Sequence, residues 1–503
     1  MFFKRTYFRK IYNLIYFVAF IFLCFLFFSF FMLQIVTYPV QAAEVVYKSG
    51  FHKLHAIQNT AGHKHGIMSK DTMLKVNSVN INRSPYFNPI VHTEIVHSDA
   101  EYKAATNNDI LSLNYLTKQA LKNPEIKSSI YKYLGYKENI SIAKSLPEPT
   151  LGFGLTDANG LNNPEIGINS MSYWKFSASQ AIPFPTKLII NARIKKTIYK
   201  SLKDKTITLK LFTVLNVKNV YYNLALLEKD INTFKENLSL LSILLRYADG
   251  DYASGRLSAR GPIRIILETD QIKTRLILFE KQKNRLIYIL SKLTGLKAAY
   301  FKNKKAKFTE KVKHFSAQFN KLMNTADKFN PALKEARENI KTSLLGIDLA
   351  NQGYYPNFSI FAGYGDRYSL QPVISGGISV SIPLYFNENQ MPKIEKAKKY
   401  SINAVYKYDW VKLRTIQNLR TAISNIKNDY KAYSINKKIT EPEAKLLFNS
   451  YAKSLMSGKV QTFPLLDSFI KLLLIRLKTY EFKAEYFKDS AFLDAVLGKN
   501  VKL

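Results

Sequence analysis

The sequence predicts a mainly α-helical protein with a small β part, built from a duplicated unit. Three observations support this fold class. Residues 187–249 contain neither Gly nor Pro, which allows one very long helix. Four short segments alternate apolar residues with small polar ones, as strands with one apolar face do. A set of landmarks also recurs about 200 residues further along the chain.

The duplication is visible as five short landmarks that occur twice in the same order. The pairs are Asn123-Pro124 and Asn330-Pro331, Pro149 and Pro356, Ile182-Pro183 and Ile382-Pro383, Ser254 and Ser457, and Leu293 and Val496. We therefore assign a first repeat to residues 109–297 and a second to residues 321–498. A solvated linker at 298–320 joins them, and residues 499–503 are a tail. Each repeat should hold a helix, a β-hairpin (150–182 and 357–382) and a long helical hairpin.

The long helices carry a heptad pattern. At about 1.5 Å per residue, residues 187–249 would span about 95 Å, which is longer than a globular domain. Apolar residues recur along it at spacings of three and four, as in helices that pack side by side: Val220, Leu224, Leu227, Ile231, Phe234, Leu238, Leu241 and Leu245. In the second repeat, Pro442 should kink or break the corresponding helix. Gly261-Pro262 should likewise interrupt the returning helix of the first repeat early.

The strand segments are typical of a wall with one apolar and one small, polar face. Ile374, Ile378 and Val380 alternate with Ser375 and Ser379, and the other three segments follow the same pattern. A transmembrane β-barrel needs this alternation, and a soluble hairpin with one buried face shows it as well. Four strands cannot close a barrel, because about eight is the usual minimum. If the strands span a membrane, three chains together would supply twelve.

The N-terminus is organised like an export signal. Four basic residues precede an uncharged stretch at 11–36, and Val40-Gln41-Ala42 offers a cleavage site. We assign residues 1–42 to a signal peptide; the alternative is an uncleaved inner-membrane anchor. Residues 43–108 lack periodicity and are interpreted as a flexible periplasmic extension. His63 and His65 within it are weak candidates for metal binding.

Composition excludes several classes of protein. Cys24 is the one cysteine, so a disulfide scaffold is excluded. No P-loop, G-x-S-x-G or H-E-x-x-H motif occurs, and we expect no enzymatic activity and no cofactor. The net charge is +37. It favours anionic cargo or partners, or reflects a Lys-rich coding bias. The basic run at 302–307 is interpreted as solvated linker, with no nucleic-acid binding.

Several short elements match a known family. LPEPTLGFG at 146–154 resembles its LPDPTL signature, and QAIPFPTK at 180–187 resembles its QPIPFPGK element, with Thr186 where Gly is usual. YASGR at 252–256 resembles the turn of its long hairpin. Asn330-Pro331 and Tyr355-Pro356-Asn357 resemble elements of its second half. As a set, over about residues 109–498, the chain resembles the TolC-like outer-membrane efflux proteins.

The resemblance implies an architecture and partners. Three chains would form a twelve-stranded β-barrel in outer-membrane lipid, above a long periplasmic α-barrel. The homotrimer would dock on a periplasmic adaptor and an inner-membrane pump of the RND or ABC type. The adaptor contacts would be the turns at Gly255, Arg256, Leu257, Ser258, Gly458, Lys459 and Val460. Helix would change to strand at Pro149, Pro183, Pro356 and Pro383, and Asp467 would be a candidate gate residue.

The function expected from the sequence is therefore a passive outer-membrane channel. It would be the exit duct of a tripartite efflux or type I secretion system, with heavy-metal cations as the leading cargo because the LPEPTL and IPFP elements resemble the metal-exporting branch. One alternative is an inner-membrane-anchored, coiled-coil periplasmic adaptor. Another is a structural coiled-coil protein without a pore.

Overall fold

The computed structural model describes residues 109–156, 171–457 and 462–498. The chain divides into two units, residues 1–96 and 97–503, and every described residue belongs to the second. The expected signal peptide, the whole N-terminal extension (43–108) with His63 and His65, and the tail at 499–503 lie outside the described residues.

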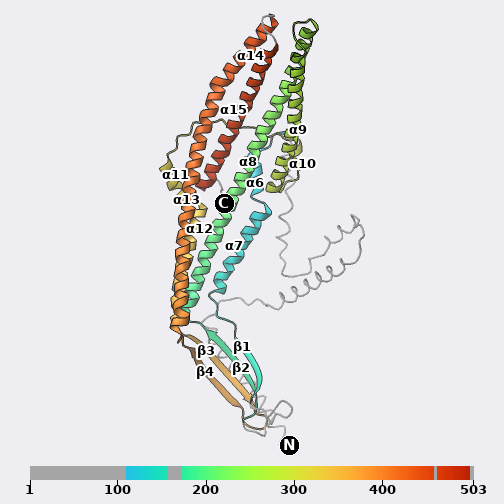
Figure 1. Ribbon diagram of the computed structural model, residues 1–503. Coiled ribbons are helices and arrows are strands. Elements are labelled where there is room, and N and C mark those ends of the chain that lie inside the picture. Colours follow the sequence, from blue (N-terminus) through green and yellow to red (C-terminus); the bar gives the residue numbers. More distant parts are fainter. Residues whose placement is uncertain (1–108, 157–170, 458–461, 499–503) are drawn as a thin grey trace, which may run out of the picture. The chain divides into compact units, whose positions relative to one another are not determined.

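The described part contains the same order of elements twice (Figure 1). The first set is α6 (Leu113–Ala120), α7 (Pro124–Ile142), β1 (Thr150–Thr156), β2 (Tyr173–Ile182), α8 (Pro185–Ala253) and α9 (Arg260–Thr294). The second is α11 (Phe319–Phe329), α12 (Pro331–Asn351), β3 (Asn357–Asp366), β4 (Val373–Ser381), α13 (Met391–Ile435), α14 (Glu441–Met456) and α15 (Thr462–Leu497). The short helix α10 (Ala299–Lys302) lies between the two sets.

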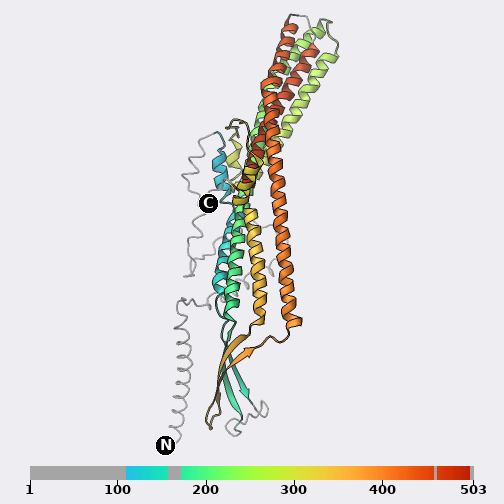
Figure 2. The same ribbon diagram turned by 90° about the vertical axis from the view of Figure 1, so that its left-hand side faces the viewer.

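The long helices pack side by side in a single layer, with α8 in the middle (Figures 1 and 2). Near the sheet the order is α7, α8, α12, α13; further away α8 packs against α9 and α15, and α15 against α14. The 69 residues of α8 form one uninterrupted helix. Its predicted seam is the packed face, because Leu224, Leu227, Ile231, Phe234 and Leu241 are all buried.

The two predicted proline interruptions have different outcomes: the one at Pro442 is confirmed and the one at Gly261-Pro262 is not. The second long helix changes at a five-residue π-helical turn, Asn436–Thr440, and Pro442 lies directly after it in the first turn of α14. The prediction that Gly261-Pro262 interrupts the returning helix was wrong, because α9 begins at Arg260. Pro262 therefore occupies a first turn, where the missing N–H has no helical partner to lose, whereas Pro442 removes an N–H from a continuing helix, and the π-helical turn lies directly before it.

The prediction of a solvated linker was also wrong. Tyr300, Phe301 and Ala306 are buried in the main core, and Lys304 is only 7% exposed, with its Nζ 4.3 Å from the Tyr300 ring centroid. The Tyr221 hydroxyl lies within hydrogen-bond distance of the backbone of this segment. The basic run at 302–307 predicts a solvated segment, but the Tyr300-Phe301 pair before it is buried. Burial of each ring stabilises the packed position of the segment by about 1.5–3 kcal/mol.

Each repeat closes on itself through an asparagine. Asn123 caps α7, and its side-chain amide donates to the Leu293 carbonyl at the end of α9 (2.9 Å). Asn330 caps α12 in the same way and donates to the Val496 carbonyl at the end of α15 (2.7 Å). In each repeat, the start of the helix before the β-hairpin (α7 or α12) is therefore hydrogen-bonded to the end of the last helix (α9 or α15).

The end of α15 requires a glycine at this joint. Gly498 has φ +72, and a Cβ there would lie 2.6 Å from the Phe329 carbonyl oxygen. Only glycine adopts this left-handed conformation without strain and allows the close backbone approach.

No helix among the described residues combines the length and the apolar character needed to cross a membrane.

Candidate membrane wall, helix–strand junctions and far turns

The four strands form one antiparallel sheet in the order β1-β2-β3-β4. Its register aligns Phe153, Phe176, Tyr364 and Ile374 in one cross-strand row. Because side chains alternate along each strand, one face of the sheet is apolar on all four strands. We call this the apolar face: Leu151, Phe153, Leu155, Trp174, Phe176, Ala178, Ile182, Phe358, Ile360, Ala362, Tyr364, Ile374, Ile378 and Val380. Gln180 interrupts it, and Asp366 ends it.

The opposite face, called here the polar face, carries mainly small residues. Its members include Gly152, Gly154, Ser177, Ser179, Ser359, Gly363, Gly365, Ser375, Gly377 and Ser379. Two rings lie flat over its glycines: a Cβ on Gly377 would come 2.8 Å from the Phe361 ring, and one on Gly365 would come 2.5 Å from Tyr173. Few side chains therefore protrude from the polar face, because it consists mainly of glycine, serine and aromatic rings that lie against the glycines.

Most of the apolar face is uncovered, although Tyr364 within it is buried. No described helix packs across the sheet; the strands pack on one another. Leu151 is 81% exposed, Ile378 70% and Phe153 66%. A soluble hairpin buries its apolar face, since each large side chain left in water forgoes about 1.5–3 kcal/mol. This sheet is therefore built to be covered by something outside the described chain.

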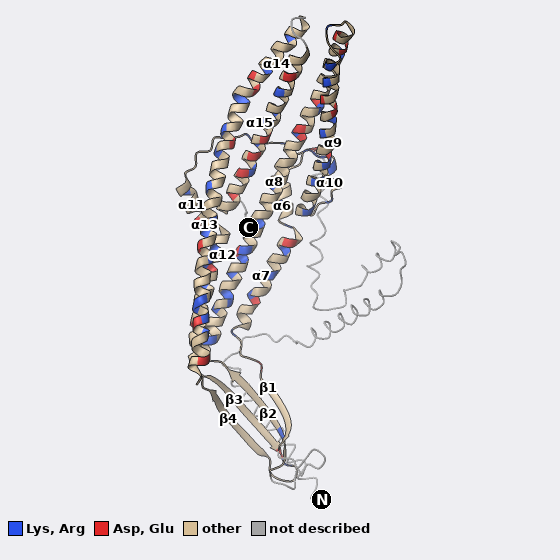
Figure 3. Ribbon diagram, viewed as in Figure 1, with Lys and Arg blue, Asp and Glu red and all other residues tan. Residues whose placement is uncertain are grey.

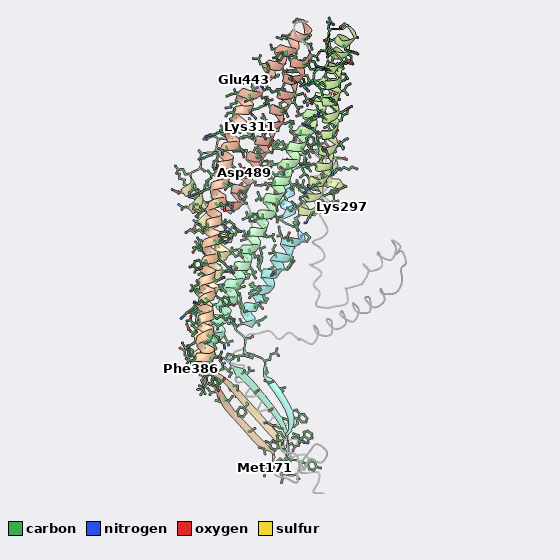
Figure 4. The ribbon with its side chains drawn as sticks, in the orientation of Figure 1. Met171, Lys297, Lys311, Phe386, Glu443 and Asp489 are labelled. Carbon is green, nitrogen blue, oxygen red and sulfur yellow. The ribbon has the colours of Figure 1, made fainter. Side chains whose placement is uncertain are left out.

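Aromatic residues lie at both ends of this wall. Phe153 stacks on Trp174 (5.1 Å between ring centroids) near the end away from the helices. At the helix end, Phe184 stacks on Tyr355 (4.8 Å). Figure 4 shows the two levels, with Met171 labelled at the far end of the sheet and Phe386 where the strands meet α13. Aromatic girdles of this kind border the apolar band of membrane β-barrels.

The four predicted junction prolines all lie between helix and strand. Pro149 immediately precedes β1 and Pro356 precedes β3, while Pro183 follows β2 and Pro383 follows β4. Sequence reasoning missed the residues that tie the two junctions together. Lys187 at the start of α8 donates to the Asn357 side chain at the start of β3 (2.8 Å), which also accepts from the Phe184 N–H.

The far turn of the first repeat reverses the chain at Gly255, which has φ +72. Arg256 is exposed there and pairs with Asp251 (3.1 Å). Ser258 is exposed as well, whereas Leu257 is buried and packs beneath Gly261. Leu257 thus holds the turn together from inside. Gly458, Lys459 and Val460 of the second turn lie outside the described residues.

Asp467 lies on α15, one turn beyond its start, and joins the two helical hairpins. Its Oδ1 accepts from the Arg264 guanidinium on α9 at 2.6 Å. The same guanidinium lies 5.6 Å from the Phe463 ring centroid. The partner Arg264 was not predicted; the sequence shows only a basic residue nine positions after Gly255, in what the structure places as the second turn of α9.

The comparison with solved structures decides the fold. VceC, an outer membrane protein of Vibrio cholerae, aligns with a TM-score of 0.65 at 13% identity, over 77% of this chain and 96% of its own. The CmeC outer membrane channel of Campylobacter jejuni aligns at 0.65 and 14%, over 77% and 85%. CusC, which forms a transmembrane channel, aligns at 0.66 and 13%, over 77% and 92%. The chain has the fold of these outer-membrane channels. No protein-family model and no curated protein sequence matches it.

The predicted fold class is thereby confirmed for the single chain: a duplicated, mainly helical outer-membrane channel fold with four strands. In this channel fold the sheet is the candidate membrane wall and the Gly255 turn is the candidate contact for a partner. Among the residues that the structure describes, no group of three or more His, Cys, Asp or Glu side chains is placed to hold a metal ion.

One further cluster of titratable groups stands out in the helices. Asp429 on α13 and Asp489 on α15 bring two carboxyl groups together (Asp489 is labelled in Figure 4). Burial, followed by the charge of Asp489, raises the pKa of Asp429 to about 7, and burial raises that of Asp489 too. Asp429 Oδ2 meets no donor among the described residues. A proton shared between the two carboxyl groups removes both the cost of burying a second negative charge and the repulsion between the two charges.

Proposed function

We propose that the protein is an outer-membrane channel: the exit duct of a tripartite efflux or type I secretion system. The observation that carries the proposal is the sheet, apolar and exposed on one face along all four strands, small and polar on the other. A membrane-spanning barrel wall needs lipid on the first face and water on the second. The helices would then form the large periplasmic part.

The open edges of the sheet support a homotrimer. Among the described strands, β1 and β4 each pair on one side only. Unpaired backbone groups are not tolerated in lipid, so the edges must meet other strands, and three chains supply twelve. The helical layer has open ends as well: Tyr406 and Trp410 on α13 are 70% and 65% exposed, and Tyr131 on α7 is 60% exposed. A second copy placing its α7 against α13 covers all three.

Transport through this duct would be passive. The energy would come from an inner-membrane pump of the RND or ABC type, coupled through a periplasmic adaptor. Gly255, Arg256 and Ser258 are the described residues best placed to meet the adaptor, with Gly458, Lys459 and Val460 as their counterparts in the second repeat. Opening would separate α9 from α15 at the Arg264–Asp467 pair. Heavy-metal cations stay a proposed cargo on the resemblance of the LPEPTL element.

The matched test uses two adjacent residues of β4 that point to opposite faces. Ile378→Lys places a cation on the apolar face, where a lysine costs about 2–4 kcal/mol per chain near the bilayer midplane. Ser379→Lys places the same charge on the polar face, where water solvates it. We expect Ile378→Lys to be lost from the outer-membrane fraction of a density gradient and Ser379→Lys to remain there. Equal insertion of both variants would contradict the proposed wall.

The same gradient separates the channel from the anchored adaptor. Wild-type protein in the outer-membrane fraction, beginning near Ala43, is the expected result. Protein in the inner membrane that retains residues 11–36 would overturn the channel proposal in favour of the adaptor.

A further inference from the structure

The polar face of the sheet carries a single charged side chain on the described strands. Lys175 on β2 lies on it, together with Tyr173, Ser177 and Ser179. β1 and β4 contain no charged residue, and Asp366 of β3 lies on the opposite face. Figure 3 shows the sheet almost free of charge beside the densely charged helices.

Among the described residues, no side chain directly across from Lys175 on the paired strands neutralises it. Its cross-strand neighbours are Gly154 on β1 and Gly365 on β3, neither of which has a side chain. The residue is exposed, and no carboxylate of the described residues pairs with it. Asp366 accepts instead from the Tyr368 N–H at 3.1 Å. The ammonium group thus extends over a low surface of glycine and serine.

The position of Lys175 on the polar face also separates it from lipid. Lysines that contact lipid headgroups extend from an apolar surface to the membrane boundary. Here the apolar surface belongs to the neighbours Trp174 and Phe176, which point the other way. In a closed barrel the polar face lines the water-filled interior. Three symmetry-related Lys175 side chains would then form a ring inside the wall.

The helices next to the sheet add charge of the same sign. α13 carries ten Lys or Arg against three Asp or Glu, and residues 185–210 at the start of α8 carry eight against one. The summed field of such an excess concentrates anions around the duct, whichever way each side chain points.

We propose that Lys175 makes the membrane part of the duct selective for anionic solutes. The inference rests on the proposed channel function. Rings of Lys or Arg select anions in pores by the same electrostatics by which acidic rings select cations. Residues that face the interior of a β-barrel determine the ion preference of its pore. The glycine neighbours of Lys175 leave its charge unscreened by other described side chains on the paired strands. This inference argues against the free heavy-metal cations proposed above as cargo from the LPEPTL resemblance, and favours organic or metal-complex anions instead.

The test is the reversal potential of the purified full-length protein in planar bilayers under a potassium chloride gradient. Wild-type should pass chloride in preference to potassium. Lys175→Gln should weaken this preference, and Lys175→Glu should weaken it further or reverse it. Lys118→Glu makes the same change of charge at an exposed position of α6, away from the sheet, and should leave the ion preference unchanged. The difference between variants should be larger at about 0.01 M salt than at about 1 M, because the Debye length falls from about 30 to 3 Å.

Each outcome separates the two proposals. Conducting channels whose ion preference is the same in wild-type, Lys175→Gln and Lys175→Glu would overturn this inference and leave the channel function standing. A preference for potassium in wild-type would overturn it as well. Absence of conducting channels from every variant, including one in which Arg264→Ala removes the proposed closing pair, would overturn the channel function and with it the ring. Retained single-channel conductance in the Gln variant shows that the barrel has folded.

Discussion

Asp429 and Asp489 place two carboxyl groups against each other between α13 and α15. The groups that face them are Asn425 from α13, and Glu485 and Lys488 from α15. On α8, burial raises the pKa of Asp230 to about 7, and the charge of Glu481 on α15 adds to the shift. Buried acidic groups thus lie on both sides of α15, and the raised pKa of Asp429 favours its protonated form at mildly acidic pH.

The sign of the pH effect follows from the direction of these shifts. An aspartate ordinarily titrates near pH 4, so between about pH 4 and 7 the folded state binds a proton that the unfolded state has lost. The contribution of this pair to stability is therefore fully present below about pH 4 and is lost as the pH rises through about 7. We expect the midpoint of thermal unfolding to drop between pH 5 and pH 8, and to drop less in Asp429→Asn.

The control for this prediction is Asp270→Asn on α9. Asp270 is about 61% exposed and pairs with Lys273, so removing its charge should leave the pH slope of wild-type intact. Equal slopes in wild-type and Asp429→Asn would show that the carboxyl pair does not titrate with unfolding.

At the scale of whole elements, the two asparagine joints differ in burial although they have the same geometry. Asn330 is 7% exposed and its bond to the Val496 carbonyl is buried, whereas the bonds of Asn123 are partly solvated. Asn330→Ala loses a helix cap and leaves a buried carbonyl unpaired, which together cost about 2–4 kcal/mol. Asn123→Ala should cost about 1 kcal/mol, mainly the cap.

Chemical denaturation of the two alanine variants in detergent measures the difference. The comparison is internally matched, because both asparagines are followed by a proline at the start of a helix. Equal destabilisation by the two substitutions would show that burial of the second joint contributes nothing.

Much of this element structure follows from the sequence. The absence of Gly and Pro predicted α8, and period-two alternation predicted both faces of the sheet, because each is a local consequence of backbone geometry. The errors have non-local causes. Pro262 lies in the first turn of α9, and Phe301 is buried by helices that are distant in sequence. The local sequence around each residue did not predict these positions. The candidate site divides in the same way: Gly255 was predicted, but Arg264, Lys187 and Lys175 depend on which elements become neighbours.

At the scale of the molecule, the Arg264–Asp467 pair matters because it links the α9 and α15 hairpins near their far ends. Both side chains are well exposed, at 45% and 58%, so the pair contributes at most about 1 kcal/mol to stability. We expect Arg264→Ala and Asp467→Asn to leave the unfolding midpoint nearly unchanged and to raise the current through the reconstituted duct.

Lys273→Ala provides the comparison for that current. Lys273 pairs with Asp270 at 3.0 Å, but both residues lie on α9, so the pair joins no two elements. A similar rise in this variant, or no rise in the Arg264 and Asp467 variants, would show that the link between hairpins does not hold the entrance.

The paired asparagine joints have a consequence for the ancestry of the chain. Each repeat ties its own first long element to its own last, so closure does not depend on the peptide that connects the halves. Two genes of half the length, or one half-length gene used six times, would meet the same closure requirement in a ring of six. Fusion of tandem copies would then have altered the number of chains in the ring without altering its wall, and freed each half to diverge, as Arg256 and Lys459 have at equivalent turns.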